Sequence, residues 1–206
     1  MYTSLTRQPV RLNIKEINKM CRFKSGIILK SRSYIAEGYD DSHTNLLEKL
    51  NIEDTTENAM RKFVRVELIP DNDEWWTDPK DWKVNIDQDI LPDWFKEDEQ
   101  KYLEEFRKRV IGWWNDHVFV DKTIERLECG YYRLKRCEVK KLLNNVKVML
   151  DNSTVQRMLD NSTVQEMWDN STVQEMWDNS IIVRDLDNNV IVAETNNAKL
   201  KKHVNK

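Results

Sequence analysis

The stretch "DNSTVQRMLDNSTVQEMWDNSTVQEMWDNS", residues 151–180, repeats nine residues three times almost letter for letter. Aligned on the central aliphatic residue, related units extend on both sides, from "CEVKKLL" and "NNVKVML" before it to "DNSIIVRDL" and "DNNVIVAE" after it. The array spans about residues 137–194, and its first two units are seven residues long. A short fixed period is typical of a solenoid, in which each unit packs only on its neighbours.

A β-solenoid with two repeats per coil fits this pattern. In each repeat a strand carries its small polar and aliphatic residues inward, as Ser153, Val155 and Met158 do, and Asp-Asn makes the corner. One repeat per coil would give a perimeter of about 30 Å at about 3.3 Å per residue, too tight to enclose side chains from opposite walls. Two repeats per coil are therefore predicted.

Residues eighteen apart should then stack on one another, and residues nine apart should face opposite ways. Trp168 is predicted to lie between Leu150 and Leu186, and Trp177 to follow Leu159 on the other face. A partner would therefore contact one of the two tryptophans and not both. The corner aspartates should form two ladders, one of Asp151, Asp169 and Asp187 and the other of Asp160 and Asp178.

A helical repeat is the alternative. Ser-Thr-Val-Gln also matches a capping box, followed by Val, Met and Trp at helical spacing. A cap signal every nine residues would leave helices of barely one turn, which are below the length that sustains a helix. The β-solenoid is favoured.

The N-terminal part has the mixed pattern of an α+β head. "SGIILKSRSYIAEG" is typical of a strand or hairpin, and "KFVRVELIP" of a half-buried strand. Ser42 or Thr44 and Thr55 or Thr56 can cap two short helices. Residues 71–94 predict an ordered loop with a short strand near Trp82–Ile86. The helix over 95–116 has an apolar stripe of Tyr102, Leu103, Phe106, Val110, Trp113 and Trp114. The predicted domains are an α+β head, residues 1–130, and a β-solenoid with a basic C-terminal tail, residues 131–206.

Composition indicates a cytoplasmic protein. The 206 residues are 39% hydrophobic and 33% charged, and no apolar run approaches the about 20 residues of a membrane span. The N-terminus lacks the apolar core of a signal peptide. Three cysteines without a CxxC pair favour neither a disulfide framework nor a zinc site, so a reducing compartment is expected. No cofactor is expected.

The chain resembles repeat proteins encoded by phages and prophages, in which Asn-Ser-x-Val units follow an α+β head. The residues that carry the resemblance are "GYDDSHTNLLEKL", "FVRVELIP", "DWKVNIDQDILPDWF", "CGYYRLKRCEVKKLLNNVKVML" and the nonapeptides. The resemblance implies a β-solenoid tail, a phage origin and hence a bacterial host cell. It implies no catalytic residues.

Catalytic patterns are few. "YDDSH" and "WNDH" offer Asp41, His43, Asp116 and His117, which could together form a metal site of nuclease type. The same residues are also ordinary loop, cap and helix-end residues, and this reading is favoured. No P-loop, GxGxxG, HExxH or GxSxG motif occurs. Cys137 has cationic neighbours that could activate a thiol, but its repeat position predicts a buried small residue.

Acidic and basic residues are concentrated in different segments of the chain. "YYRLKRCEVKK", residues 131–141, combines two tyrosines with five cations, which is compatible with binding nucleic acid. A strand face opposite the acidic loop within the same protein is the favoured interpretation, because residues 71–105 carry thirteen acidic and four basic side chains. Residues 151–194 hold nine acidic and two basic side chains. Aspartate-rich β-rolls bind Ca²⁺, but their turns need glycines that this repeat lacks.

These observations predict a non-enzymatic protein-binding protein, a phage-encoded inhibitor of a host defence protein that presents an acidic repeat surface. Its partner would be a host protein with a basic or nucleic-acid-binding surface, and no membrane is involved. The predicted contact residues are Asp160, Trp168, Asp169, Trp177 and Asp178. A metal-dependent nuclease in the head is one alternative. Another is a self-assembling homo-oligomer that pairs through the edge strand "SIIVRDLDNNVIVA".

Overall fold

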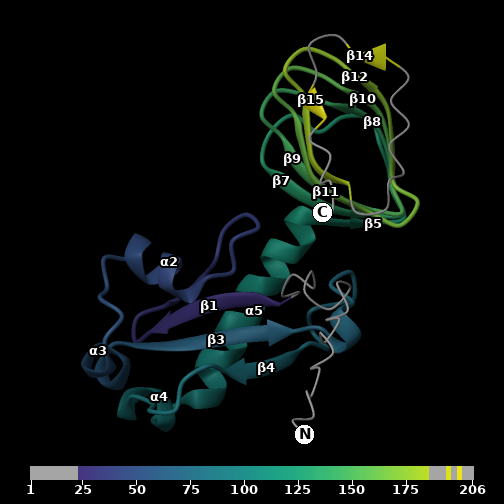
Figure 1. The fold of residues 1–206 in the computed structure, drawn as a ribbon. Helices are drawn as coiled ribbons and strands as arrows, with labels where there is room; N and C mark the ends of the chain where they lie inside the picture. The colour runs from purple at the N-terminus through teal and green to yellow at the C-terminus, as the bar shows by residue number, and fades with distance from the viewer. Residues whose placement is uncertain (1–22, 186–193, 196–198, 201–206) are drawn as a thin grey trace, which may run out of the picture.

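The computed structural model describes residues 23–185, 194–195 and 199–200. It consists of a head and a β-solenoid, joined by the long helix of the head (Figure 1). The head elements are β1 (Lys24–Leu29), β2 (Ser33–Ile35), α2 (His43–Lys49), α3 (Thr56–Arg61), β3 (Phe63–Ile69), η1 (Asp71–Asp73), β4 (Lys83–Ile86), α4 (Asp93–Glu97) and α5 (Glu99–His117). Among the described residues, every helix is too short or too polar to cross a membrane. The predicted α+β class of the head is confirmed.

The head is built on a four-stranded antiparallel sheet in the order β2-β1-β3-β4. The predicted caps at Ser42 and Thr55 begin α2 and α3, where each hydroxyl accepts a backbone N–H three residues on. On β3, Val64 and Val66 face the same side as the α5 residues and are fully buried among them. Alternation along this strand thus presents one apolar face to α5 and the other to α2.

The predicted amphipathic stripe of α5 forms the centre of the head. Its buried side chains are Tyr102, Phe106, Val110 and Trp113. Phe106 lies directly over β1 at Gly26, where an added Cβ would stand 2.3 Å from the Phe106 ring and 2.4 Å from the Tyr34 carbonyl oxygen. Only glycine leaves room for this close approach of helix and strand.

The solenoid begins earlier than the predicted boundary at residue 131. Helix α5 ends at His117, and β5 follows at once and pairs in parallel with β7. The first coil carries no recognisable repeat motif, which is why the sequence did not reveal it. The solenoid strands are β5 (Val118–Val120), β6 (Thr123–Ile124), β7 (Tyr131–Lys135), β8 (Glu138–Leu142), β9 (Lys147–Asp151), β10 (Thr154–Met158), β11 (Thr163–Trp168), β12 (Thr172–Met176), β13 (Ile181–Asp185), β14 (Glu194–Thr195) and β15 (Lys199–Leu200).

These strands form two parallel sheets that face each other across the coil (Figure 1). One has the order β15-β13-β11-β9-β7-β5 and the other β14-β12-β10-β8-β6. Successive repeats therefore lie in opposite walls, and two repeats make one coil, as predicted. Ser153, Val155 and Met158 point inward and are at most 1% exposed. Equivalent aliphatic residues stack on them in the neighbouring coils and form one continuous core.

The coils do not all have the same length. Lys147 pairs with Thr163, sixteen residues on, whereas Thr163 pairs with Ile181, eighteen residues on. A bulge after Val164 takes up one of the two additional residues, and the next corner takes up the other. The bulge shifts the register, so that Met167 lies beside Leu150 and Trp168 beside Asp151.

The prediction that Trp168 stacks on Leu150 is therefore wrong. It assumed a constant period of eighteen residues, which holds between β10 and β12 and between β11 and β13 but not between β9 and β11. Its other predicted neighbour, Leu186, lies outside the described residues. Trp177 does follow the predicted position, since its backbone N–H bonds the carbonyl of Met158, the residue before Leu159.

Candidate functional site

The surface on which the predicted contact residues lie is made by two rows of corners. The Asp160 corner row comprises residues 143–146, 159–162 and 177–180, which lead into β9, β11 and β13. The Asp151 corner row comprises residues 136–137, 151–153 and 168–171, which lead into β8, β10 and β12. The same letters, Asp-Asn-Ser, occur in both rows, but residues 160–162, 169–171 and 178–180 belong to four-residue turns, whereas residues 151–153 form a shorter corner.

In the Asp160 corner row, each corner is a four-residue turn. The backbone N–H of Ser162 bonds the carbonyl of Leu159, and that of Ser180 bonds the carbonyl of Trp177, both at 3.2 Å. The left-handed residue is Asp160 in one turn and Asp178 in the next, with φ of 57° and 56°. Aspartate and asparagine tolerate this region better than other non-glycine residues, which explains why they recur at the corner.

The aspartates of this row form the predicted ladder. Asp178 Oδ2 accepts the backbone N–H of Asp160 at 3.1 Å. Asp160 Oδ2 accepts the backbone N–H of Asn144 at 2.9 Å in the next coil. Both aspartates are exposed, so each carboxylate is held by one oxygen while the group remains open to solvent. Two negative charges are thereby aligned along one edge of the solenoid.

The Asp151 corner row arranges its aspartates differently, with the Asp151 and Asp169 carboxylates close to each other and to Lys135. Here Asn152, with φ of 49°, takes the left-handed position, and Asp151 remains in β9. Asp151 is 3% exposed and its Oδ1 lies 2.6 Å from Lys135 Nζ. Burial raises the pKa of Asp151 despite this ion pair.

Asp151 and Asp169 do lie on one edge, as predicted, since Lys135 Nζ is 2.6 Å from Asp151 Oδ1 and 3.7 Å from Asp169 Oδ2, but Asp151 is buried. Asp169 is itself left-handed, with φ of 54°, and lies one position further along its corner because of the additional residue. Its carboxylate is 59% exposed and lies 3.7 Å from Lys135 Nζ. Asp187 lies outside the described residues. This edge of the solenoid thus presents a partly compensated acidic group.

The two candidate tryptophans precede the aspartates of different rows. Trp177 leads into Asp178 and Trp168 into Asp169, and both side chains are half-buried. Trp177 Nε1 donates to Glu175 Oε2 at 3.2 Å. Because β11 and β12 belong to opposite walls, the tryptophans lie on opposite edges, as the two-repeat coil predicts.

The basic stretch of residues 131–141 meets the head. Lys24, which is fully buried, pairs with Asp41 at 2.9 Å, and Asp41 lies 3.6 Å from Arg133. Lys135 Nζ lies 4.1 Å from the centre of the Trp76 ring, in the acidic loop. Arg133 and Lys135 are both buried, so these two cations are used within the protein and are closed to nucleic acid.

The four residues of the predicted metal site do not form one ligand group. Asp41 is turned toward Lys24, because that buried ammonium group needs a counter-charge. His117 stacks on Tyr131 with ring centres 4.2 Å apart, and its Nδ1 lies 2.9 Å from the Tyr131 carbonyl oxygen. Asp116 is exposed at the end of α5. His43 instead lies beside Asp87, on the α2 side of the head sheet.

Cys137 is a core residue, as predicted. It is 3% exposed, and its Sγ donates to the Phe119 carbonyl oxygen at 3.2 Å. Burial raises the pKa of the Cys137 thiol above its ordinary value. A neutral, enclosed thiol is not an activated nucleophile.

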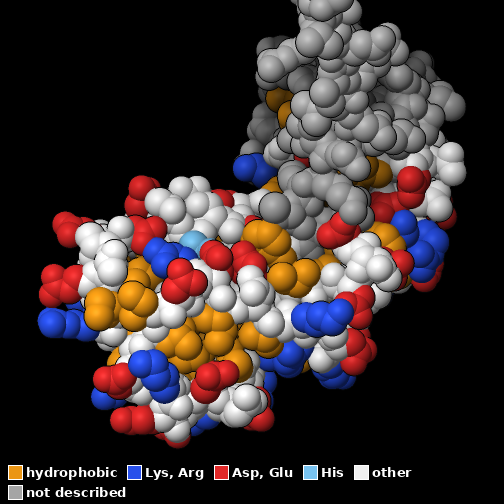
Figure 2. Space-filling model, turned by 60° about the horizontal axis from the view of Figure 1, so that its bottom comes forward, with side chains coloured by type: hydrophobic (Ala, Val, Ile, Leu, Met, Phe, Trp, Pro, Cys, Tyr) orange, Lys and Arg blue, Asp and Glu red, His pale blue; other side chains and the backbone are white. Residues whose placement is uncertain are grey.

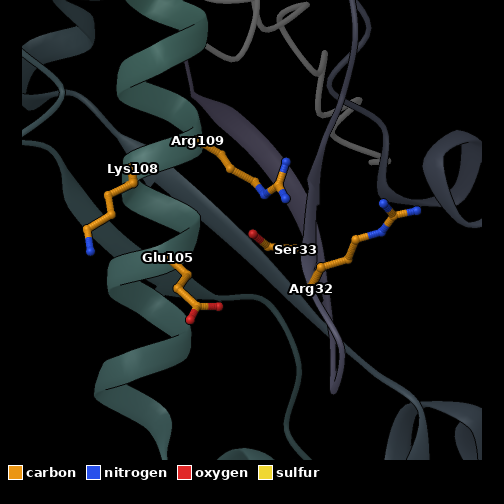
Figure 3. A pocket seen from close by; sticks show the side chains of 5 residues that line it. All are labelled: Arg32, Ser33, Glu105, Lys108 and Arg109. Atoms are coloured by element: carbon orange, nitrogen blue, oxygen red, sulfur yellow. The ribbon is translucent and has the colours of Figure 1, made fainter.

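A hollow of about 310 Å³ lies between α5 and the start of β2. Figure 3 shows Arg109 and Glu105 from α5 on either side of the Ser33 hydroxyl, whereas Lys108 and Arg32 extend away from it. Ser33 is 3% exposed, and its Oγ has no hydrogen-bond partner among the described residues. The residues that line the hollow include three cationic side chains and one acidic one, and all four charged residues are exposed. Figure 2 likewise shows acidic and basic side chains interspersed over the head.

Together these features define the chain as an α+β head fused to a β-solenoid with one acidic corner row. Comparison with protein-family models, with curated proteins and with solved structures found no match. The resemblance to phage-encoded repeat proteins thus rests on the sequence motifs themselves.

Proposed function

We propose that this protein is a non-enzymatic binding protein that captures a host protein through the Asp160 corner row. Following the resemblance of its motifs, we place it among phage-encoded inhibitors of bacterial defence proteins, acting in the host cytoplasm. The observation that carries the proposal is the ladder of Asp160 and Asp178, two exposed carboxylates each fixed by a backbone N–H of the neighbouring coil. Its partner would present a basic surface.

Fixed charges suit such a contact for an energetic reason. Ordering a mobile side chain at an interface costs about 0.5–1.5 kcal/mol, and carboxylates already held by hydrogen bonds avoid part of this cost. Aligned negative charges also speed the encounter with a basic surface and disfavour acidic ones. Trp177 lies next to Asp178 and offers the half-buried aromatic side chain typical of an interface hot spot.

The proposed contact is narrower than the five residues predicted from the sequence. Asp160, Trp177 and Asp178 share one edge, whereas Trp168 and Asp169 belong to the opposite corner row. One rigid partner surface of ordinary size would use the first group, because Asp169 is already close to Lys135.

The test is the double change Asp160→Asn/Asp178→Asn. Asparagine keeps an oxygen that accepts the backbone N–H and tolerates the left-handed corner, so it removes the charge and preserves the turn. The matched control is Asp93→Asn/Asp116→Asn, which removes two exposed charges from the head. The immobilised protein is exposed to a bacterial lysate, the captured protein is identified and purified, and its affinity is titrated at two salt concentrations.

We expect the corner double variant to bind at least about tenfold more weakly, with a flatter salt dependence, and the control to bind like the intact chain. Equal binding by both double variants would refute the proposal. Deleting residues 163–180 removes one whole coil, because Thr163 and Ile181 occupy equivalent positions. That deletion leaves the remaining strands in register and should abolish capture while the head stays folded.

A further inference from the structure

We propose that His43, Glu67 and Asp87 form a binding site for a divalent transition-metal ion such as Zn²⁺. The site lies where α2 begins, against the face of the sheet opposite α5. Glu67 is on β3, and Asp87 directly follows β4. One potential ligand atom from each residue lies within 4.8 Å of the other two. The site is independent of the proposed contact on the solenoid.

The contacts of the His43 ring are the first argument. Its Nε2 lies 3.1 Å from the carbonyl oxygen of Val66. A carbonyl oxygen only accepts hydrogen bonds, so Nε2 carries a proton. In a neutral imidazole, Nδ1 is then an acceptor, yet it faces Asp87 Oδ2 at 3.3 Å. Nδ1 and the Asp87 carboxylate oxygen therefore face a common position, which a metal ion bound by both would occupy.

The spacing fits a metal ion. Zn–N bonds are about 2.0–2.1 Å and Zn–O bonds about 2.0–2.2 Å, so two ligand atoms at a tetrahedral angle are about 3.4 Å apart. The distance from His43 Nδ1 to Asp87 Oδ2 is 3.3 Å. A Glu67 carboxylate oxygen lies within 4.8 Å of both atoms and would supply the third ligand, which leaves a fourth position for water.

The surroundings hold the three ligands in place. Asn85 Nδ2 donates to Glu67 Oε2 at 2.9 Å across the paired strands β3 and β4. The Asp87 backbone N–H donates to the Arg65 carbonyl oxygen at 3.0 Å. The Val66 carbonyl fixes the orientation of the His43 ring, as second ring nitrogens bonded to carbonyls do in metal sites.

The ligand set also selects the class of ion. One imidazole and two carboxylates suit Zn²⁺, Mn²⁺, Co²⁺ or Ni²⁺, whereas Mg²⁺ and Ca²⁺ take oxygen ligands. The His43 side chain is 10% exposed and that of Asp87 is 54% exposed, so a buried ligand is paired with an accessible one. An ion can therefore enter from solvent at Asp87.

Calorimetric titration of the untagged full chain with ZnCl₂, and with MgCl₂ for comparison, tests the site. We expect one Zn²⁺ per chain, weak or no binding of Mg²⁺, and at least about tenfold weaker Zn²⁺ binding in Asp87→Asn and in His43→Gln. Asp116→Asn is the matched control, because it removes an exposed acid outside the site. Circular dichroism of each variant checks that it is folded.

Two results would overturn the proposal. If the intact chain binds Zn²⁺ no better than Asp87→Asn, His43, Glu67 and Asp87 do not hold the ion. If Asp116→Asn weakens binding as much as Asp87→Asn does, the ion is held elsewhere. A second measurement is the melting temperature, which Zn²⁺ should raise in the intact chain and in Asp116→Asn but not in His43→Gln.

Discussion

Two serines in identical repeats should respond in opposite ways to the same substitution. Ser153 and Ser162 each follow Asp-Asn and precede Thr-Val-Gln, and both are at most 1% exposed. Ser153 Oγ accepts the backbone N–H of Cys137 at 2.9 Å and can donate to the Asp151 carbonyl oxygen at 2.9 Å. Ser162 Oγ has no hydrogen-bond partner in the described part of the chain.

The difference comes from the two corner conformations. In the Asp160 corner row, Val146 occupies the position equivalent to Ser162 in the preceding coil. Its backbone N–H bonds the Leu143 carbonyl within its own turn. The corner at residues 136–137 of the Asp151 corner row is shorter, so the N–H of Cys137 needs an acceptor from the next coil. The hydroxyl is thus required in one row and superfluous in the other.

The magnitudes follow from the desolvation of polar groups. Ser153→Ala leaves the buried N–H of Cys137 without its acceptor, which costs about 1–3 kcal/mol, and removes the serine's own hydrogen bond, worth about 0.5–1.5 kcal/mol. We expect the free energy of unfolding to fall by about 2–3 kcal/mol. Ser162→Ala removes a buried hydroxyl that has no partner and should raise the free energy of unfolding by about 1 kcal/mol.

Urea unfolding followed by far-ultraviolet circular dichroism measures both variants against the intact chain. The hydrogen-exchange rate of the Cys137 amide tests the local effect. This rate should increase in Ser153→Ala and stay unchanged in Ser162→Ala. Equal shifts of the two variants, or a larger loss in Ser162→Ala, would refute the assignment of the two corner types. Ser180→Ala repeats the Ser162 case, because Ser180 Oγ is likewise without a partner among the described residues.

Two further predictions concern the head and the buried ion pair. Gly26→Ala should lower the melting temperature and cost about 1–3 kcal/mol, because its Cβ would meet Phe106 at 2.3 Å and a backbone carbonyl at 2.4 Å; an unchanged melting temperature would contradict the close packing of α5 on β1. Burial raises the folded-state pKa of Asp151 above its ordinary 3.8, so the folded state binds more protons than the unfolded state between these two pKa values. The contribution of Asp151 to the free energy of unfolding therefore falls as the pH rises from 3.8 through the raised pKa. Urea unfolding from pH 4 to 8 should show that Asp151→Asn lacks this decline, whereas parallel pH profiles would refute the effect.

Much of the head could be predicted from local chemistry. The caps at Ser42 and Thr55, the alternation along β3 and the stripe on α5 are all short-range patterns, and the structure has them where the sequence predicts. The division of the helical stretch into α4 and α5 was not predicted. The sequence identified only one of the three proposed metal ligands, His43. Glu67 and Asp87 lie beside it only because β3 pairs with β4.

The sequence by itself determined the two-repeat β-solenoid, because inward Ser, Val and Met at a nine-residue period can be buried in only one way once the perimeter of a coil is considered. Only the tertiary structure decided which aspartates are exposed. One additional residue at the bulge after Val164 and another at the next corner changed the register, so that residues 169–171 belong to a four-residue turn whereas residues 151–153 of the same row form a shorter corner. The corner adopted depends on whether a backbone N–H bonds within its turn or reaches the next coil. Identical sequences can therefore adopt different corner conformations, because contacts between neighbouring coils decide which one forms.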